Sequence, residues 1–275
     1  NNPYQEASNI VTSPKADLTE DNALYTWKNP KDTVSFFLSA DVKTTDNIPK
    51  VTKKVNFPLQ DISGYSEYAK PTENIDSDNP DIIKLSSEIA AGEDDEFVVV
   101  TKLAQWTQDN INYNLSTLTA DVSQKASWVL KNKQGVCDEL TNLFIAMNRA
   151  LGIPARFVSG VAYTDSPLFP EKWGLHGWAE VYFPGFGWVP FDVTYAEYGR
   201  IDPAHIILKN SVDVANDETV YSWRGRDVTI VPGKLSTDVN IVSIGSPVNP
   251  DISITASVQN DEVGFGSYNL VEAKI

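Results

Sequence analysis

The sequence is poor in the residues that define several common protein classes. It has one cysteine among 275 residues, which excludes an internal disulfide and leaves the thiol free for chemistry. It has no apolar run near the roughly 18 residues that a membrane-spanning helix needs, so we expect no membrane insertion. Basic residues are also scarce. Only 22 stand against 37 acidic ones, and the formal net charge of −15 argues against nucleic acid as a partner.

What is present is typical of a globular protein, with 41% hydrophobic and 11% aromatic residues. Composition predicts three segments. Residues 1–75 form an arm and a β-rich segment: the polar first 16 residues are expected to be loose or extended. Residues 76–218 form the central segment, and residues 219–275 a β-rich tail with four or five strands, as in a small β-sandwich. In the first segment, β-favouring runs predict strands at 23–27, 33–42 and 50–57.

The central segment alternates from helical to strand-like patterns. Apolar residues at helical spacing and their stop signals predict helices at 81–91, 95–112, 123–131 and 138–151. The acidic run Glu93–Glu96 lacks the glycine and the spaced oxygen ligands of a calcium loop, and favours instead the negative N-terminus of the second helix. Strand-like runs follow at 156–163, 174–183 and 187–194.

The single cysteine, Cys137, lies where the fourth helix is predicted to begin. Gly135 permits a tight entry into that helix, and a helix N-terminus favours a thiolate, so we expect a lowered pKa for Cys137. Taken alone, a cysteine before an apolar helix is more often a buried small hydrophobe. A nucleophile would also need a base and a group that orients the base.

Only two histidines are available as that base. His176 begins a predicted strand, 39 residues after the cysteine, and Asp192 lies 16 residues further on in the next strand. A Pro-Gly turn joins these two strands, so a hairpin can bring the carboxylate beside the imidazole and hold its tautomer. His205 has no cysteine or carboxylate placed with it by this pattern, so a structural role is favoured.

Three separated blocks of sequence carry a family resemblance. GVCDEL with MNRALGIPARFVSG, HGWAEVYFPGFGWVPFDVT, and IDPAHIIL occur in one order between about Ser77 and Leu208. In this they resemble the transglutaminase-like superfamily, which includes animal transglutaminases, peptide N-glycanases and microbial cysteine peptidases. The resemblance implies an α+β, papain-like cysteine-proteinase core, in which the helix bearing the cysteine packs on an antiparallel sheet.

The resemblance also implies roles for particular residues. Cys137 would be the nucleophile, His176 the general base and acid, and Asp192 the orienting carboxylate. The backbone N–H of Cys137 would stabilise the oxyanion, with Gln134 or Tyr113 as the second donor. Trp178 would wall the substrate cleft. No metal site or cofactor is expected, and no acidic cluster matches the calcium sites of the animal enzymes.

These observations predict a thiol-dependent enzyme that transfers acyl groups from protein or peptide amides through a thioester. Hydrolysis is the favoured outcome. The alternatives are crosslinking of glutamine to lysine, and a non-catalytic surface adhesion or scaffold module that keeps a relic triad. The absence of an initial methionine and the acidic, thiol-poor composition favour an extracellular or cell-surface protein from which an upstream segment has been removed. The oligomeric state is left open.

Overall fold

The chain divides into two compact units, residues 1–237 and residues 238–275. The computed structural model describes residues 4–19, 22–30, 32–119, 123–167, 171–214, 221–226, 229–233, 235–246, 255–258 and 271–274. Among these residues, no helix is long and apolar enough to cross a membrane.

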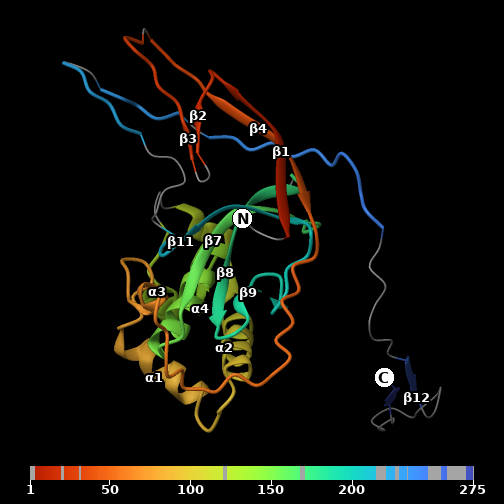
Figure 1. Ribbon diagram of the computed structural model, residues 1–275. Coiled ribbons are helices and arrows are strands. Elements are labelled where there is room, and N and C mark those ends of the chain that lie inside the picture. The colour runs from red at the N-terminus through yellow and green to blue at the C-terminus, as the bar shows by residue number, and fades with distance from the viewer. Residues whose placement is uncertain are drawn as a thin grey trace. The chain divides into compact units, whose positions relative to one another are not determined.

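A five-stranded antiparallel sheet forms the centre of the first unit (Figure 1). Its strands lie in the order β10-β9-β8-β7-β11. Valine, alanine and aromatic residues dominate the three middle strands, as expected where both faces of a sheet are covered. The strands are β7 (Ala155–Tyr163), β8 (Trp173–Phe183), β9 (Gly187–Asp192), β10 (Glu197–Tyr198) and β11 (His205–Ser211).

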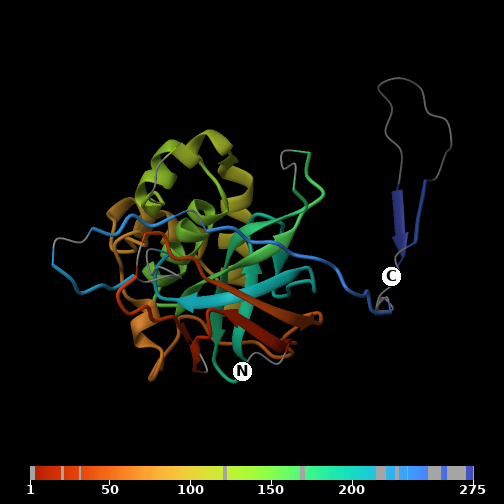
Figure 2. The ribbon, with the colours of Figure 1, turned by 90° about the horizontal axis from the view of Figure 1, so that it is seen from above.

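Helices gather on one face of this sheet (Figure 2). The central helix packs against β7 and β8 and is surrounded by the other three, so twelve of its fourteen residues are buried. The helices are α1 (Pro80–Ile89), α2 (Glu96–Asn110), α3 (Ala126–Asn132) and α4 (Cys137–Ala150), with short 3-10 helices η1 (Ser66–Ala69) and η2 (Leu115–Thr119). All four predicted helices are therefore confirmed, with ends that differ by a few residues.

The start of α4 is fixed by a buried carboxylate. Glu139 accepts hydrogen bonds from the backbone N–H of Val136, at 3.0 Å, and of Gln124, at 3.1 Å, which satisfies an otherwise unpaired N–H group at the helix N-terminus. Just before the helix, β6 (Gln134–Gly135) pairs in parallel with β5 (Asn112–Tyr113). A Cβ atom on Gly135 would lie 2.5 Å from that of Glu139, so glycine is needed for close approach.

The end of α4 is fixed by a buried guanidinium. Arg149 donates hydrogen bonds to the backbone carbonyls of Ala155, Lys70 and Val212. These carbonyls belong to β7 and to the segments that follow η1 and β11, so one side chain joins three parts of the chain. Burial lowers the pKa of Arg149 to about 10, which leaves it charged at neutral pH.

The N-terminal strands differ from the prediction. The first 16 residues, expected to be loose or extended, include the extended strand β1 (Gln5–Ser13), which pairs with β4 (Phe37–Thr44). The run at 50–57 forms no strand beyond an isolated bridge from Asn56 to Asp95. Two very short strands, β2 (Asp17–Leu18) and β3 (Ala23–Leu24), pair with each other. β3 and β4 overlap the strands predicted at 23–27 and 33–42. β1 is not predicted because it is polar and mostly exposed, so its pairing leaves no alternating apolar pattern.

The β-sandwich predicted for the tail falls in large part on residues outside the described ones, so it stays a prediction. Among the described residues after 219, only β12 (Thr255–Val258) and β13 (Val271–Lys274) form strands, and they pair antiparallel. The alternating run at 239–244 has no strand partner there. Alternation predicts a strand only where another strand is available to pair with it.

Candidate active site

Helix α4 delivers the thiol of Cys137 to the middle strand β8. The sulfur atom lies 3.6 Å from Oδ1 of Asp138, and the backbone N–H of Gly177 is its hydrogen-bond donor. A second contact, from Oγ1 of Thr141 to the carbonyl of Gly177 at 3.1 Å, fastens the helix to the same strand. Gly177 follows His176 directly, so the thiol meets β8 next to the predicted base.

Only glycine permits this approach of helix and strand. A Cβ atom on Gly177 would lie 2.5 Å from Oδ1 of Asp138 and 2.5 Å from the ring of Phe157. Both distances are far inside van der Waals contact, and the second neighbour belongs to the packed core. A side chain at position 177 would therefore force the side chains of Asp138 and Phe157 to shift.

The electrostatic setting of the thiol contradicts one prediction. Burial raises the pKa of Cys137, the charge of Asp138 raises it further, and the N–H of Gly177 lowers it by less. The predicted low pKa is therefore wrong, because the helix N-terminus is outweighed by desolvation and by a carboxylate one residue away. The resting thiol keeps its proton and needs a base to remove it.

The side chains of His176 and Asp192 are in contact, as expected for a hairpin formed by β8 and β9. Strands β8 and β9 pair with Ala179 opposite Phe191, and beyond that pair Nε2 of His176 lies 2.6 Å from Oδ2 of Asp192. The other carboxylate oxygen, Oδ1, accepts the backbone N–H groups of Thr194, at 2.7 Å, and of Tyr195, at 3.0 Å. These bonds hold the carboxylate in one orientation.

The ionisation of Asp192 sets the tautomer of His176. Burial alone would raise the pKa of Asp192, but the charges and hydrogen bonds of His176 and His205 lower it below its ordinary value. An ionised carboxylate can only accept, so Nε2 of His176 carries the hydrogen and Nδ1 is left to take a proton.

His205 contacts the same carboxylate oxygen of Asp192 as His176 does, which corrects the prediction that no carboxylate is placed with it. Its Nε2 lies 3.2 Å from Oδ2 of Asp192, and its Nδ1 lies 2.8 Å from Oδ1 of Asp202. Burial disfavours the charged imidazole, but the bonds to these carboxylates raise its pKa to about 9. The sequence signal that could have identified this pair is Asp202, three residues before the histidine in IDPAHIIL.

The same residues offer candidate metal ligands. Two groups have ligand atoms within 4.8 Å of one another: His176, Asp192 and His205, and Glu197, Asp202 and His205. The separation of 2.6 Å between Nε2 of His176 and Oδ2 of Asp192 is a hydrogen-bond length. Donor atoms about 2.0–2.2 Å from a tetrahedral zinc ion would lie further apart. The arrangement therefore fits a hydrogen-bonded network better than a metal centre.

Of the two predicted oxyanion donors, one lies at the thiol. The hydroxyl group of Tyr113 accepts the backbone N–H of Cys137, and burial followed by the nearby thiol raises the pKa of this tyrosine. The side chain of Gln134 contacts Asn114: its Oε1 accepts a hydrogen bond from Nδ2 of Asn114 at 3.0 Å.

Aromatic rings close the site on two further sides. Tyr195 stacks on His176 with 4.7 Å between ring centroids and 13° between ring planes. Trp178, expected to wall the substrate cleft, is only 1% exposed and contacts the rings of His176 and His205 from behind. It is a buried wall rather than accessible cleft surface. His176 itself is 7% exposed and Cys137 9%, so a substrate must displace part of this cover.

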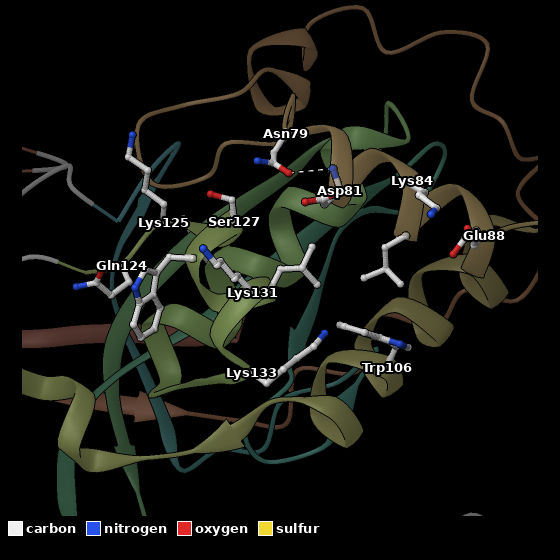
Figure 3. A pocket seen from close by; sticks show the side chains of 13 residues that line it. Asn79, Asp81, Lys84, Glu88, Trp106, Gln124, Lys125, Ser127, Lys131 and Lys133 are labelled. Carbon is white, nitrogen blue, oxygen red and sulfur yellow. Dashed lines mark hydrogen bonds between the residues drawn. The ribbon is translucent and has the colours of Figure 1, made fainter.

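A separate groove lies between α1, α2 and α3 (Figure 3). It has a volume of about 780 Å³, and none of the three predicted catalytic residues lines it. Its walls carry lysines and two tryptophans, and Figure 3 shows Lys133 beside Trp106. This groove is therefore distinct from the site around Cys137.

Comparison with known proteins agrees with the geometry. Residues 83–193, which contain Cys137, His176 and Asp192, match the core of the transglutaminase-like superfamily. The chain is 31% identical over 99 residues to the uncharacterised protein YebA of Bacillus subtilis, covering 33% of this chain and 13% of YebA. It is 28% identical over 229 residues to an uncharacterised protein of Haemophilus influenzae, covering 70% of this chain and 60% of that relative.

A solved structure shares the fold. A proposed cysteine protease from Cytophaga hutchinsonii superimposes with a TM-score of 0.58 at 20% identity, covering 78% of this chain and 74% of that one. The chain spans less than two thirds of the length of both curated relatives. The helix bearing the cysteine, the antiparallel sheet and the matched residues lead to one conclusion: residues 83–193 of this chain are a transglutaminase-like superfamily core domain.

Proposed function

We propose that this protein is a thiol-dependent enzyme that hydrolyses amide bonds of proteins or peptides. The observation that carries the proposal is the pair formed by His176 and Asp192, held beside the strand residue that contacts the thiol of Cys137. The name given to the Cytophaga hutchinsonii structure agrees with a peptidase activity.

The first half-reaction uses the free nitrogen of His176. Nδ1 of His176 takes the thiol proton as the sulfur of Cys137 attacks the substrate carbonyl, so proton removal and attack are concerted. This suits a thiol whose pKa is raised, because no resting thiolate is needed. The carbon–nitrogen bond then breaks, the imidazolium returns its proton to the leaving amine, and a thioester remains.

The second half-reaction releases the acyl group. Water attacks the thioester, His176 takes a proton from that water, and the sulfur leaves as the thiol after the proton is returned. Throughout, the negative oxygen of each tetrahedral intermediate would accept the backbone N–H of Cys137. The hydroxyl group of Tyr113, which now occupies that N–H, would turn to donate to the same oxygen.

Turnover of a disordered protein substrate in the presence of a fluorescent primary amine tests the proposal. We expect new peptide termini, no incorporation of the amine, and loss of at least about 10³-fold in rate for Cys137→Ala, because the nucleophile is gone. Mass spectrometry of the products measures both outcomes. Thr117→Ala, at a half-buried hydroxyl that donates a hydrogen bond to the carbonyl of Asn114, is the matched control and should retain full activity.

Two results would overturn this assignment. Amine incorporation without new termini would establish the crosslinking reaction instead. No product from the folded wild-type protein, across a panel of peptide and glutamine amides, would favour the non-catalytic scaffold.

A further inference from the structure

The carboxylate of Asp192 is shared by two imidazoles. Oδ2 lies 2.6 Å from Nε2 of His176 and 3.2 Å from Nε2 of His205. The second histidine is itself held by Oδ1 of Asp202 at 2.8 Å, with an oxygen of Glu197 4.0 Å away. The contacts therefore run from His176 through Asp192 and His205 to Asp202, so the network extends beyond the three proposed catalytic residues.

This contact needs a particular shape of the sheet. Strands β9 and β11 are separated by β8 and β7, so a flat sheet would hold them about 14 Å apart. The contact between the side chains of Asp192 and His205 therefore means that the sheet curves and brings these strand ends closer together. Gly160 of β7 makes room for it, since a Cβ atom there would lie 2.6 Å from the ring of Trp178, and that ring contacts His205 edge-on.

Burial makes the second imidazole an element of the site rather than a surface group. The side chains of His205 and Asp192 are 2% and 0% exposed. With a carboxylate on each ring nitrogen, His205 has both N–H groups donating and holds a positive charge between two negative ones. It thereby restrains the Oδ2 atom that His176 depends on.

We propose that His205 is a positioning residue for the acyl-transfer reaction: a buried imidazolium, anchored by Asp202, that fixes the carboxylate of Asp192 against His176. The expected effect of His205 on the reaction rate rests on the proposed function. Its structural consequence, the state of His176, is independent of any substrate.

The histidine content of the chain makes the test direct, because only two imidazoles contribute to a spectrum of nitrogen-15 histidine. In His205→Phe we expect His176 to lose its single tautomer. His205→Gln, which keeps one donor toward Asp192, should restore part of the wild-type signal. Asp202→Asn should shift it less than the phenylalanine variant. Asp213→Asn, which removes a buried carboxylate bonded to Asn74, is the matched control and should leave the signal unchanged.

Kinetics supply the second readout. We expect kcat of folded His205→Phe to fall about 10–100-fold with KM within about twofold, because orientation of the base is lost and substrate contacts are kept. Wild-type signals for His176 in a folded His205→Phe protein would overturn the positioning role. An altered His176 signal in proteins that show no turnover at all would instead retain the positioning role and reject the proposed function.

The groove in Figure 3 carries a second, independent inference. Four lysines line it, together with two tryptophans, in a chain whose net charge is −15. Two acidic residues, Asp81 and Glu88, also line it, so lysines outnumber carboxylates there. The lysines are Lys84, Lys125, Lys131 and Lys133.

The groove offers both charge and aromatic surface. Nζ of Lys133 lies 4.3 Å from the ring centroid of Trp106, and burial lowers the pKa of that lysine, so an anion nearby would stabilise its charged form. A long polyanion would meet repulsion from the acidic remainder of the chain, whereas a short one can stay within the groove. Lys133 precedes Cys137 by four residues, so their Cα atoms are within about 14 Å.

We infer that this groove binds a short acidic peptide segment that also carries an aromatic side chain. The binding test uses the Cys137→Ala protein, so that its outcome does not depend on turnover. The probes are a fluorescent peptide of alternating glutamate and phenylalanine and its lysine counterpart, with single-stranded DNA as competitor.

We expect the acidic peptide to bind, and its affinity to fall at least about tenfold in Lys84→Glu/Lys131→Glu and with added salt. Lys15→Glu/Lys43→Glu, at two exposed lysines outside the groove, is the matched control and should bind as the parent does. Equal loss in both double variants, no binding of the acidic peptide, or tighter binding of the DNA would each overturn the inference.

Discussion

Replacing Asp192 with asparagine is expected to lower kcat of the proposed hydrolysis by about 10³–10⁴-fold in a protein that still folds. Oδ1 of the new amide can keep the two backbone N–H groups that Asp192 now accepts. Its NH2 group must then face His176, which can accept this bond only if Nε2 gives up its hydrogen. The hydrogen moves to Nδ1, and the nitrogen meant to take the thiol proton is already occupied.

A steady-state assay of Asp192→Asn, together with its unfolding midpoint, measures this effect. Asp165→Asn is the matched control, since it removes an exposed carboxylate that bonds Lys172 and Tyr163 outside the network. We expect the control to keep wild-type kcat. If Asp192→Asn kept kcat within tenfold of the wild type, the general-base role of His176 would be untenable.

Replacing Glu96 with glutamine is expected to stabilise the protein at alkaline pH and to change little at pH 5. Glu96 is fully buried at the start of α2, and both of its carboxylate oxygens lack a hydrogen-bond partner. Burial, with a smaller effect from Asp95, raises its pKa from 4.5 to about 8. Between pH 4.5 and about 8, the folded protein therefore keeps a proton on Glu96 that the unfolded chain has released.

The sign of the pH effect follows from that difference. The contribution of Glu96 is fully present below about pH 4.5 and is lost as pH rises through about 8, so wild-type stability falls over this range. The loss amounts to roughly 3–5 kcal/mol at pH 9. Glutamine cannot ionise, so the free energy of unfolding of Glu96→Gln should not show this decline.

Chemical denaturation at pH 5, 7 and 9 compares the two proteins. Asp94→Asn, in the same acidic run but exposed and paired with Lys54, is the matched control and should follow the wild type within about 0.5 kcal/mol. If the free energy of unfolding of Glu96→Gln and of the wild type changed with pH in the same way, the raised pKa of Glu96 would be contradicted.

The parts of this molecule that the sequence predicts are those controlled by local pattern. Helix α4 follows from its apolar spacing and from the Gly-Ile-Pro stop after it. The meeting of His176 and Asp192 follows from the short turn that makes β8 and β9 a hairpin. In both cases the residues that decide the outcome are close together in the chain.

The parts that escaped prediction depend on contacts between distant segments or on burial. β1 pairs with a strand beyond two intervening short strands, and His205 meets Asp192 only because the whole sheet curls. The pKa of Cys137 was mispredicted because a helix N-terminus can be read from sequence, whereas desolvation and the placement of Asp138 cannot.

The position of β11 has a consequence for the order in which the protein matures during synthesis. Chains emerge N-terminal end first, and the family core ends at residue 193, before His205 has been made. Strand β11 must then pair with β7. Its residue Ile207 exchanges two hydrogen bonds with the side chain of Gln5, which lies near the N-terminus of the chain. A nascent chain with Cys137, His176 and Asp192 already outside the ribosome would therefore lack the imidazolium behind Asp192. The proposed active site would therefore be complete only late in synthesis, after β11 had paired with β7 and contacted Gln5.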